Sequence, residues 1–387
     1  MPPKKNPKRR GLSKSARNRR KNEIAAYENN PDSDTEHDFE DIDELNDEEE
    51  RLVTEFAKEQ EHVESDRPVD FYKSEDNFPE GALKGVVTSV HRRNFITLSD
   101  GEELICFLPR RLMIGERKYK HPVAVGDVVA VEPVENVTQE KQCMLVGIKE
   151  RKSLLSRAAH FKSDQEQVIA ANIDQLIVVV AAAEPAYKIR FIDRVIITAE
   201  RSQIECVICI NKIDLVAQGD DPYEVAEFYT KLGYKVLMLS AKENKGIEEF
   251  QQLLENKNSV LTGQSGVGKS SLLNAVQPGL GIKINEVSKK TGKGKHTTTS
   301  VQMHMLNFGG SVVDTPGIRS FGMHELLKAD LVAYYPEMAS YIGLCRFNNC
   351  SHTGVEPGCK IMEALEAGVI DPRRHDSYVS IYETLKI

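Results

Sequence analysis

The chain has 387 residues, of which 40% are hydrophobic, and its formal net charge is −8. This length predicts two or three domains, and no apolar run reaches the roughly 18 residues of a membrane span. The basic, polar N-terminus lacks the apolar segment of a secretory signal. The seven cysteines are an odd number, and three of them lie close together near the C-terminus. We therefore expect a cytoplasmic protein with reduced thiols and no membrane partner.

Residues 1–75 form a charged extension, with 14 Lys and Arg against 21 Asp and Glu. Their net charge of −7 leaves the rest of the chain almost neutral. The first 22 residues are basic and residues 32–50 are acidic. Such blocks bury too little apolar surface to offset chain entropy, so we expect disorder. Two interpretations of the basic arm stay open, which are contact with RNA phosphates and a solubilising tail.

Residues 76–155 are predicted to form a small β-barrel. Five short β-rich runs, GVVTSV, NFITLSD, EELICFLP, DVVAVEPV and CMLVGIKE, are separated by turn residues. This number of strands in this length is typical of the oligonucleotide-binding (OB) fold. Basic residues gather at the predicted strand ends and loops, and we keep two interpretations of them, an RNA-binding surface and an ordinary solvated rim. They are Arg92, Arg93, Arg110, Arg111, Arg117, Lys118 and Lys120.

Residues 156–325 have the pattern of an α/β domain with buried parallel strands, DQLIVVVAAA, ECVICINKID and KVLMLSA. An N-K-x-D motif follows the second strand. Its Asp214 carboxylate can accept two hydrogen bonds from guanine, a donor pair that adenine lacks. The Lys212 stem can lie along the base, and Asn211 can tie the loop to its neighbours. The backbone of the S-A-K sequence after the third strand can donate to guanine O6. The motifs therefore predict GTP and GDP as ligands, bound by Asn211, Lys212, Asp214, Ser240, Ala241 and Lys242.

A phosphate-binding loop follows in VLTGQSGVGKSSLL, residues 260–273. It contains G-x-x-x-x-G-K-S between a strand-like and a helix-like run, which is the context that this motif requires. Glycine lets backbone N–H groups turn toward the phosphates. Lys269 can reach the β and γ oxygens, and the Ser270 hydroxyl can bind Mg²⁺. We expect the phosphates to be lined by Gly263, Gln264, Ser265, Gly266, Val267, Gly268, Lys269, Ser270 and Ser271.

Two later segments have the pattern of GTPase switches. The first, KKTGKGKHTTTS at residues 289–300, is polar and rich in Gly and Lys, and without its neighbours it would be interpreted as a solvated basic loop. One of its threonines, Thr297, Thr298 or Thr299, is expected to complete the Mg²⁺ shell; we prefer Thr298, followed by Thr299. The second segment, MHMLNFGGSVVDTPG, predicts a strand pair that ends in Asp314, a further Mg²⁺ ligand, while the N–H of Gly317 can meet the γ-phosphate.

The order of these motifs is unusual. In Ras-like GTPases the phosphate loop comes first, whereas here base recognition precedes the phosphate loop and the switches come last. Joining the original termini and opening new ones elsewhere gives the same sheet. The sequence therefore predicts a circularly permuted P-loop GTPase domain, whose switch region leads into a C-terminal domain and can transmit the nucleotide state to it.

Residues 326–387 contain Cys345, Cys350, His352 and Cys359. Three thiolates and one imidazole at this spacing are a tetrahedral zinc set. Nothing marks an open catalytic position, so we expect one structural Zn²⁺ in a mostly helical domain; the alternative is free thiols with a surface histidine. Arg373, Arg374 and His375 follow, and we expect them to face a partner.

With this motif order, the chain resembles the ribosome small-subunit-dependent GTPase A family (RsgA, also called YjeQ) over roughly residues 82–385. The phrases IAANIDQLIVVV, NKIDLV, GQSGVGKSSLLNA and CRFNNCSHTGVEPGC are similar to recurrent phrases of that family. The resemblance implies an N-terminal OB barrel, a circularly permuted GTPase domain and a C-terminal zinc domain. It also implies GTP hydrolysis stimulated by the small ribosomal subunit during late maturation of that particle.

The resemblance further implies the catalytic residue His296, acting with Lys269 and Thr298. Ras-like enzymes orient the attacking water with a glutamine at the position that is Ile318 here, whereas this family uses the histidine before the threonines. Another interpretation of His296 is contact with RNA or phosphate, and His304 and His324 are weaker candidates. Two features depart from the family: the extension 1–75 lies outside its core, and the interval from His352 to Cys359 is one residue longer than its pattern.

The leading hypothesis is a monomeric enzyme that hydrolyses GTP to GDP and phosphate and binds the small ribosomal subunit and its rRNA. The GTP state would bind the particle and the GDP state would leave it. Two alternatives stay open. One is a GTPase that acts on another RNA, and the other is an RNA-binding assembly scaffold in which GTP only gates binding.

Overall fold

In a computed structural model, the described part of the chain comprises residues 70–91, 94–109, 112, 121–134, 142–160, 163–217, 221–280, 301–314, 323 and 326–385. These residues build a β-barrel, an α/β domain and a helical C-terminal domain, all within the unit formed by residues 51–387.

Five strands of the barrel close into a ring. They are β2 (Leu83–Val90), β3 (Asn94–Ser99), β4 (Glu102–Phe107), β5 (Val128–Pro133) and β6 (Gln142–Lys149). The pairs β2–β3, β3–β4, β2–β5 and β5–β6 are antiparallel, and β4–β6 is parallel. Alternate residues of β3, beginning with the fully buried Phe95, face the core. This connectivity confirms the predicted OB-type barrel.

Two further β elements flank the barrel. β1 (Asp70–Tyr72) pairs in parallel with β6 and is followed by the 3-10 helix η2 (Glu75–Asn77). β1 lies within the range 1–75 that the sequence predicts to be a disordered extension, so the ordered barrel begins before residue 76. β7 (Leu154–His160) and β8 (Ser163–Ala171) form an antiparallel hairpin next to the α/β domain. The sequence did not predict β1, because a three-residue strand in a charged segment carries no periodicity, and it did not predict the hairpin of β7 and β8 either.

The α/β domain has a six-stranded section of sheet. Its strands are β9 (Gln175–Ala181), β10 (Glu205–Asn211), β11 (Lys235–Met238), β12 (Asn258–Thr262), β13 (Gln302–Met305) and β14 (Ser311–Asp314). Their order is β13-β14-β12-β9-β10-β11, and β13–β14 is the antiparallel pair of the section. The late strand β12 therefore lies between β14 and the early strand β9, which is the predicted permuted arrangement.

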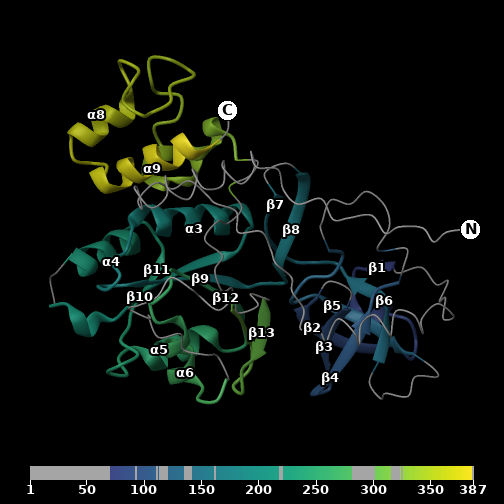
Figure 1. The fold of residues 1–387 in the computed structure, drawn as a ribbon. Helices are drawn as coiled ribbons and strands as arrows, with labels where there is room; N and C mark the ends of the chain where they lie inside the picture. The colour runs from purple at the N-terminus through teal and green to yellow at the C-terminus, as the bar shows by residue number, and fades with distance from the viewer. Residues whose placement is uncertain are drawn as a thin grey trace, which may run out of the picture. The chain divides into compact units, whose positions relative to one another are not determined.

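Helices cover both faces of this sheet, with α3 (Ile189–Arg201) and α4 (Asp221–Lys231) on one side and α5 (Ile247–Leu254) and α6 (Lys269–Val276) on the other (Figure 1). Alternate residues of β9 face opposite ways. Val178 packs in the core under α3 and α4, and Val179 packs in the core under α5 and α6. Burial on both faces explains the continuous apolar runs in the sequence.

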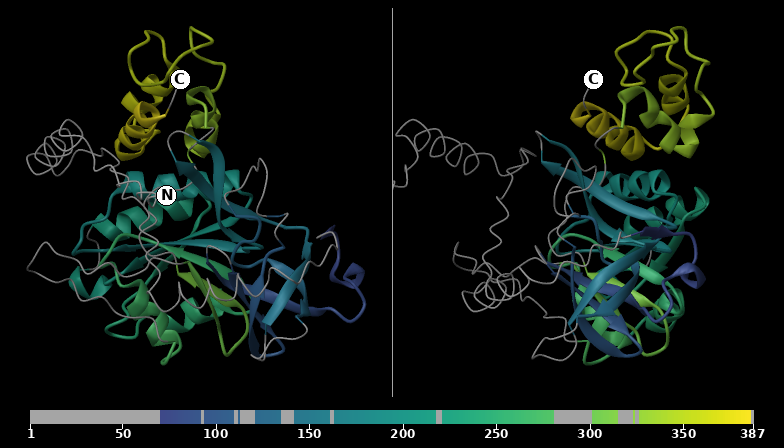
Figure 2. Two further views of the ribbon diagram at one scale, coloured as in Figure 1. Left: turned by 45° about the vertical axis from the view of Figure 1, so that its right-hand side comes forward. Right: turned by 90° about the vertical axis from the view of Figure 1, so that its right-hand side faces the viewer.

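The C-terminal domain is mostly helical, as predicted. It contains the 3-10 helix η5 (Lys328–Tyr334), α7 (Pro336–Ala339), α8 (Lys360–Glu366) and α9 (Pro372–Thr384). Asp371 caps α9 by accepting from the N–H of Arg373. Both views of Figure 2 show the yellow α9 beside the teal α3, and residues of the two helices contact each other.

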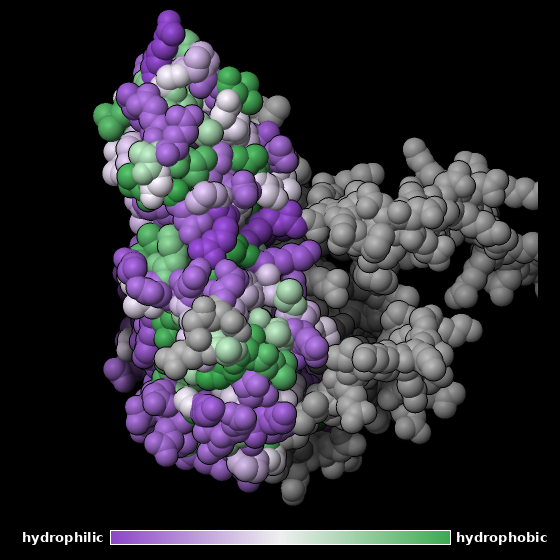
Figure 3. All heavy atoms as spheres, turned by 90° about the vertical axis from the view of Figure 1, so that its left-hand side faces the viewer, coloured by the Kyte–Doolittle hydropathy of each residue, from purple (hydrophilic) through white to green (hydrophobic). Residues whose placement is uncertain are grey.

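Large apolar side chains of the described residues lie mainly in these domain cores. The face shown in Figure 3 is largely hydrophilic, with hydrophobic side chains in small separate groups. Among the helices of the described part, none combines the length and the apolar character that crossing a membrane would require.

Candidate nucleotide site and metal cluster

The loop between β12 and α6 has the backbone form of a phosphate-binding loop. Gly266 and Gly268 have φ angles of +81° and +94°, in the left-handed region that favours glycine. A Cβ on Gly268 would lie 2.3 Å from Asn211 Nδ2. A side chain there would therefore collide with the loop of the N-K-x-D motif, residues 211–214, which we call the base-recognition loop. Lys269 begins α6, and its Nζ donates to the carbonyl oxygen of Gly263 at 2.7 Å. The loop and the first turn of α6 present backbone N–H groups that can hold anionic phosphates.

Asn211, at the end of β10, joins the three predicted nucleotide loops. Its side chain is buried; Nδ2 donates to the carbonyl oxygen of Val267 at 2.9 Å, and Oδ1 accepts from the N–H of Ala241 at 3.2 Å. The N-K-x-D motif, the S-A-K sequence and the phosphate loop therefore meet at the carboxyl edge of the sheet, where open α/β sheets bind ligands.

Asp214 lies in the short 3-10 helix η4 (Ile213–Leu215), directly after this junction. Its Oδ1 accepts from the Ser240 hydroxyl at 2.6 Å, and its Oδ2 lies 3.7 Å from Lys242 Nζ. The Ser240 hydrogen bond is the main cause that holds the pKa of Asp214 below its usual range. The carboxylate is therefore ionised at neutral pH, the form that accepts two hydrogen bonds from guanine.

The other predicted ligands of the nucleotide and Mg²⁺ are only partly within the described residues. Ser270 and Ser271 lie in the first turn of α6, and the backbone of Asp314 ends β14, paired with Leu261 of β12. His304 lies within β13. His296, the three threonines, Gly317, Ile318 and His324 lie outside the described residues. The seven basic residues of the barrel loops, for which an RNA-binding surface and a solvated rim both stay open, also lie outside them.

Cys345, Cys350, His352 and Cys359 converge in the C-terminal domain, and their ligand atoms all lie within 4.8 Å of one another. The Sγ atoms of Cys345 and Cys359 are 3.9 Å apart, and each is 3.6 Å from His352 Nδ1. A tetrahedral zinc ion would separate two sulfurs by about 3.8 Å, and a sulfur from a nitrogen by about 3.6 Å. Burial lowers the pKa of His352, which favours the neutral imidazole that binds metal. The cluster can therefore hold a metal ion.

Helix α9 supports the loop that carries His352, a role that the sequence did not reveal. His375 Nε2 donates to the carbonyl oxygen of His352 at 2.8 Å, and Tyr378 Oη donates to that of Ser351 at 2.8 Å. Arg374 and His375 are 1% and 6% exposed, so the expectation that they face a partner is wrong for these two residues. The available signal was the helical spacing of Arg374 with Tyr378 and Ile381, at i, i+4 and i+7, which places the three residues on one face of the helix.

Comparisons with known proteins agree with this architecture. The family described as RsgA GTPase matches residues 148–324. The small ribosomal subunit biogenesis GTPase RsgA of Chlorobaculum parvum is 38% identical over 309 residues, which cover 78% of this chain and 98% of the relative. The protein of the same description from Flavobacterium johnsoniae is 37% identical over 285 residues, covering 73% of this chain and 87% of the relative.

Two solved structures are also similar. The crystal structure of YjeQ from Thermotoga maritima matches with a TM-score of 0.59 and 33% identity, covering 78% of this chain and 98% of that one. YloQ, described as a circularly permuted GTPase, matches with a TM-score of 0.56 and 27% identity, covering 80% of this chain and 97% of that one. This chain therefore belongs to the RsgA family of GTPases.

Proposed function

We propose that this GTP hydrolase acts in late maturation of the small ribosomal subunit; its relatives are described as small ribosomal subunit biogenesis GTPases. The observation that carries the nucleotide part of the proposal is the pair of Asn211 hydrogen bonds, because they assemble the base loop, the S-A-K sequence and the phosphate loop into one guanine nucleotide site.

Each part of this site has a role in the proposal. Asp214 accepts from the guanine base, the Lys212 stem lies along the base, and the backbone after Ser240 donates to guanine O6. Residues 263–271 hold the phosphates, and Lys269 neutralises charge on the β and γ groups. Mg²⁺ bound with GTP would supply further charge neutralisation and would be held by Ser270, Thr298 and Asp314, with Thr299 as the alternative threonine and the Gly317 N–H at the γ-phosphate.

His296 orients the attacking water in this proposal, because Ile318 occupies the position of the Ras-like glutamine and has no hydrogen-bonding side chain. Binding to the small subunit would bring His296 to the attacking water and so start hydrolysis. The GTP state would then bind the particle, and the GDP state would leave it.

The remaining domains supply partner contacts and stability in the proposal. The barrel, which extends to about residue 155 and includes β1 at its start, and the C-terminal domain, residues 326–387, bind rRNA in this proposal. The GTPase domain comprises residues 156–325, and the charged extension ends before β1. The Cys345, Cys350, His352 and Cys359 cluster holds one Zn²⁺, whose role is structural because four protein ligands fill a tetrahedral shell. The protein is proposed to act as a cytoplasmic monomer.

Replacement of the water-orienting residue tests this proposal. We expect His296→Ala to lower subunit-stimulated GTP hydrolysis by about 100-fold or more, in the range lost with a proton-transfer or water-positioning group, while GTP affinity is retained. His304→Gln, a change of another histidine in the same domain, should keep the stimulated rate. Both variants are measured by phosphate release and by nucleotide titration.

Two results would contradict parts of the proposal. A wild-type stimulated rate in His296→Ala would remove this residue from the mechanism. Normal release of that variant from the subunit, with hydrolysis abolished, would favour the scaffold hypothesis over release that depends on GTP hydrolysis.

A further inference from the structure

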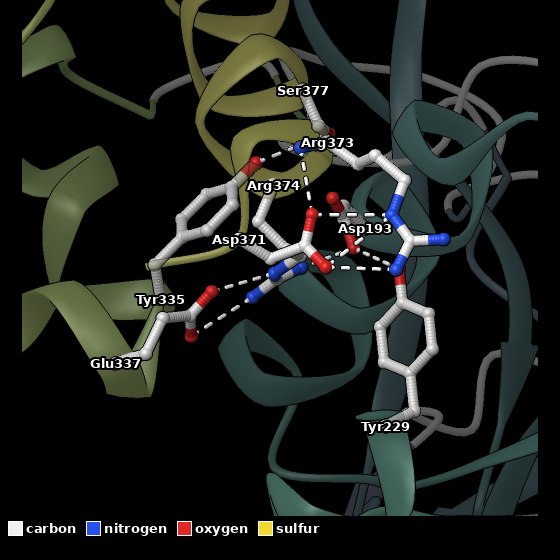
Figure 4. A network of polar contacts seen from close by, with 8 residues as sticks. All are labelled: Asp193, Tyr229, Tyr335, Glu337, Asp371, Arg373, Arg374 and Ser377. Carbon is white, nitrogen blue, oxygen red and sulfur yellow. Dashed lines mark hydrogen bonds and ion pairs between the residues drawn. The ribbon is translucent and has the colours of Figure 1, made fainter. Parts of the chain in front are cut away.

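Helix α9 is fastened to the GTPase domain by a buried ionic cluster (Figure 4). Arg374 is 1% exposed; it donates to Asp193 of α3, and its Nε donates to Glu337 Oε1 at 2.7 Å. Tyr229 of α4 donates to the same Asp193 at 2.6 Å. Removing one partner of such a buried pair leaves an uncompensated charge. This cluster therefore fixes where α9 lies against α3 and α4.

The neighbouring residue, Arg373, makes a separate and more exposed set of contacts. Its Nη1 donates to Asp221 Oδ1 at 2.9 Å, at the start of α4, and its Nη2 donates to Asp371 Oδ2 at 2.8 Å. The other oxygen of Asp221 accepts from the Tyr187 hydroxyl. Asp221 therefore bridges helix α9 of the C-terminal domain and the segment between β9 and α3, residues 182–188.

This segment reaches the base-recognition loop. The Nζ atom of Lys212 donates to the carbonyl oxygen of Glu184, three residues before Tyr187. Lys212 itself has a φ of +64° in the left-handed region, so its backbone is held in a conformation that few side chains favour. The contact with Glu184 fixes the end of the side chain whose stem is proposed to lie along guanine.

We propose that Arg373 is a positioning residue for the guanine base. Through Asp221 and Tyr187 it holds residues 182–188 where Glu184 anchors Lys212, and it therefore links base binding to the docking of α9. This inference rests on the proposed guanine site. It concerns the base, which is common to GTP and GDP, whereas the switch segments contact the γ-phosphate. Linkage is reciprocal, so guanine nucleotide binding strengthens the docking of α9 to the same extent.

The size of the effect follows from the exposure of the ion pair. The side chains of Arg373 and Asp221 are 39% and 62% exposed, and exposed pairs are weak. We expect Arg373→Ala to weaken binding of both GDP and GTP by about threefold, which is in the range of exposed ion pairs. The GTP to GDP affinity ratio and kcat should not change, while KM for GTP rises by the same factor.

The test uses the full chain and nucleotide titrations of Arg373→Ala, Tyr187→Phe and their double variant. Both changes interrupt the same chain of contacts through Asp221. The nucleotide affinity of the double variant should therefore be no lower than that of the single variant with the lower affinity. Arg373→Lys, which retains a charged donor, should restore most of the affinity. Lys231→Ala is the matched control, since it removes another exposed ion pair of α4, with Glu227 at 2.7 Å, that does not lead to Lys212.

The reciprocal effect is measured by hydrogen exchange of the α9 amides. In the wild type GDP should increase their protection, and in Arg373→Ala the increase should be smaller. Arg373→Lys and Tyr187→Phe preserve size and packing, so the comparison holds even where Arg373→Ala lowers the melting temperature.

Lys212→Ala distinguishes a failure of the positioning role of Arg373 from a failure of the proposed guanine site. Lys212→Ala should weaken guanine nucleotide binding more than Arg373→Ala does, because it removes the contact with the base itself. Unchanged affinity in Lys212→Ala would overturn the proposed base recognition. Weakened binding in Lys212→Ala, with unchanged affinity and α9 protection in Arg373→Ala and Tyr187→Phe, would overturn the positioning role alone.

Discussion

Asp214 shows what a motif predicts about a single residue and what it leaves out. The sequence was enough to predict a carboxylate after a buried strand, because N-K-x-D follows an apolar run. The hydrogen bond from Ser240, which lies 26 residues later, is a tertiary contact that no local pattern specifies. It lowers the pKa of Asp214 and so reinforces the ionised form that an aspartate already has at neutral pH.

Asp214→Asn tests base recognition at this scale. An amide has one oxygen acceptor and donates through its nitrogen, so it cannot repeat the two charge-assisted hydrogen bonds. We expect at least a tenfold loss of GTP affinity, measured by titration, since a hydrogen bond to a charged group contributes about 1.5–3 kcal/mol. A lowered carboxyl pKa means that the charge is present above the usual pKa and is lost only as the pH falls below it. The loss should therefore be the same at pH 6 and pH 8.

The control for this change is Glu243→Gln, a nearby substitution of an exposed carboxylate that pairs with Lys245. It should leave GTP affinity unchanged. Equal affinity of Asp214→Asn and wild type for GTP would show that the carboxylate does not read the base.

Secondary-structure elements were predictable where their burial pattern is strong. The barrel strands alternate or run apolar for six to eight residues, and the parallel strands β9 and β10 are buried on both faces. β1 has three residues and gains its place only by pairing with β6. The contact between α9 and α3 joins Arg374 to Asp193 across 181 positions, so nothing local in the sequence indicates it.

We expect the metal cluster and helix α9 to stabilise the C-terminal domain together, because His375 and Tyr378 of α9 hold the loop that carries His352. Cys359→Ser should abolish stoichiometric metal binding, because an alcohol is a far weaker zinc ligand than a thiolate, and should lower the melting temperature of the C-terminal domain. Metal content by elemental analysis and thermal unfolding measure the two effects. Glu363→Gln, an exposed change on α8, should bind one zinc per chain and unfold at the wild-type temperature.

A Cys359→Ser variant that retains one equivalent of zinc and the wild-type melting temperature would contradict the assigned ligand set. The expected result would show that the bound ion stabilises this domain in addition to its apolar core.

Permutation organises the whole molecule. In sequence, the base-recognition motifs lie in the first half of the GTPase domain and the switch segments in its second half, and the sheet brings the two halves together by placing β12 between β14 and β9. The barrel strand β2 pairs with β13 at Ser89 and Gln302, just after the first switch segment in sequence. The second switch segment precedes the metal-binding domain. Each end of the switch region therefore leads to a domain that is proposed to bind rRNA.

The most direct test of this account is phosphate release from GTP by the full chain alone, with purified small ribosomal subunits, and with large subunits. We expect slow release alone and with large subunits, and strong stimulation by small subunits. Equal rates in all three conditions would leave the guanine site in place but would contradict the proposed role in maturation of the small subunit.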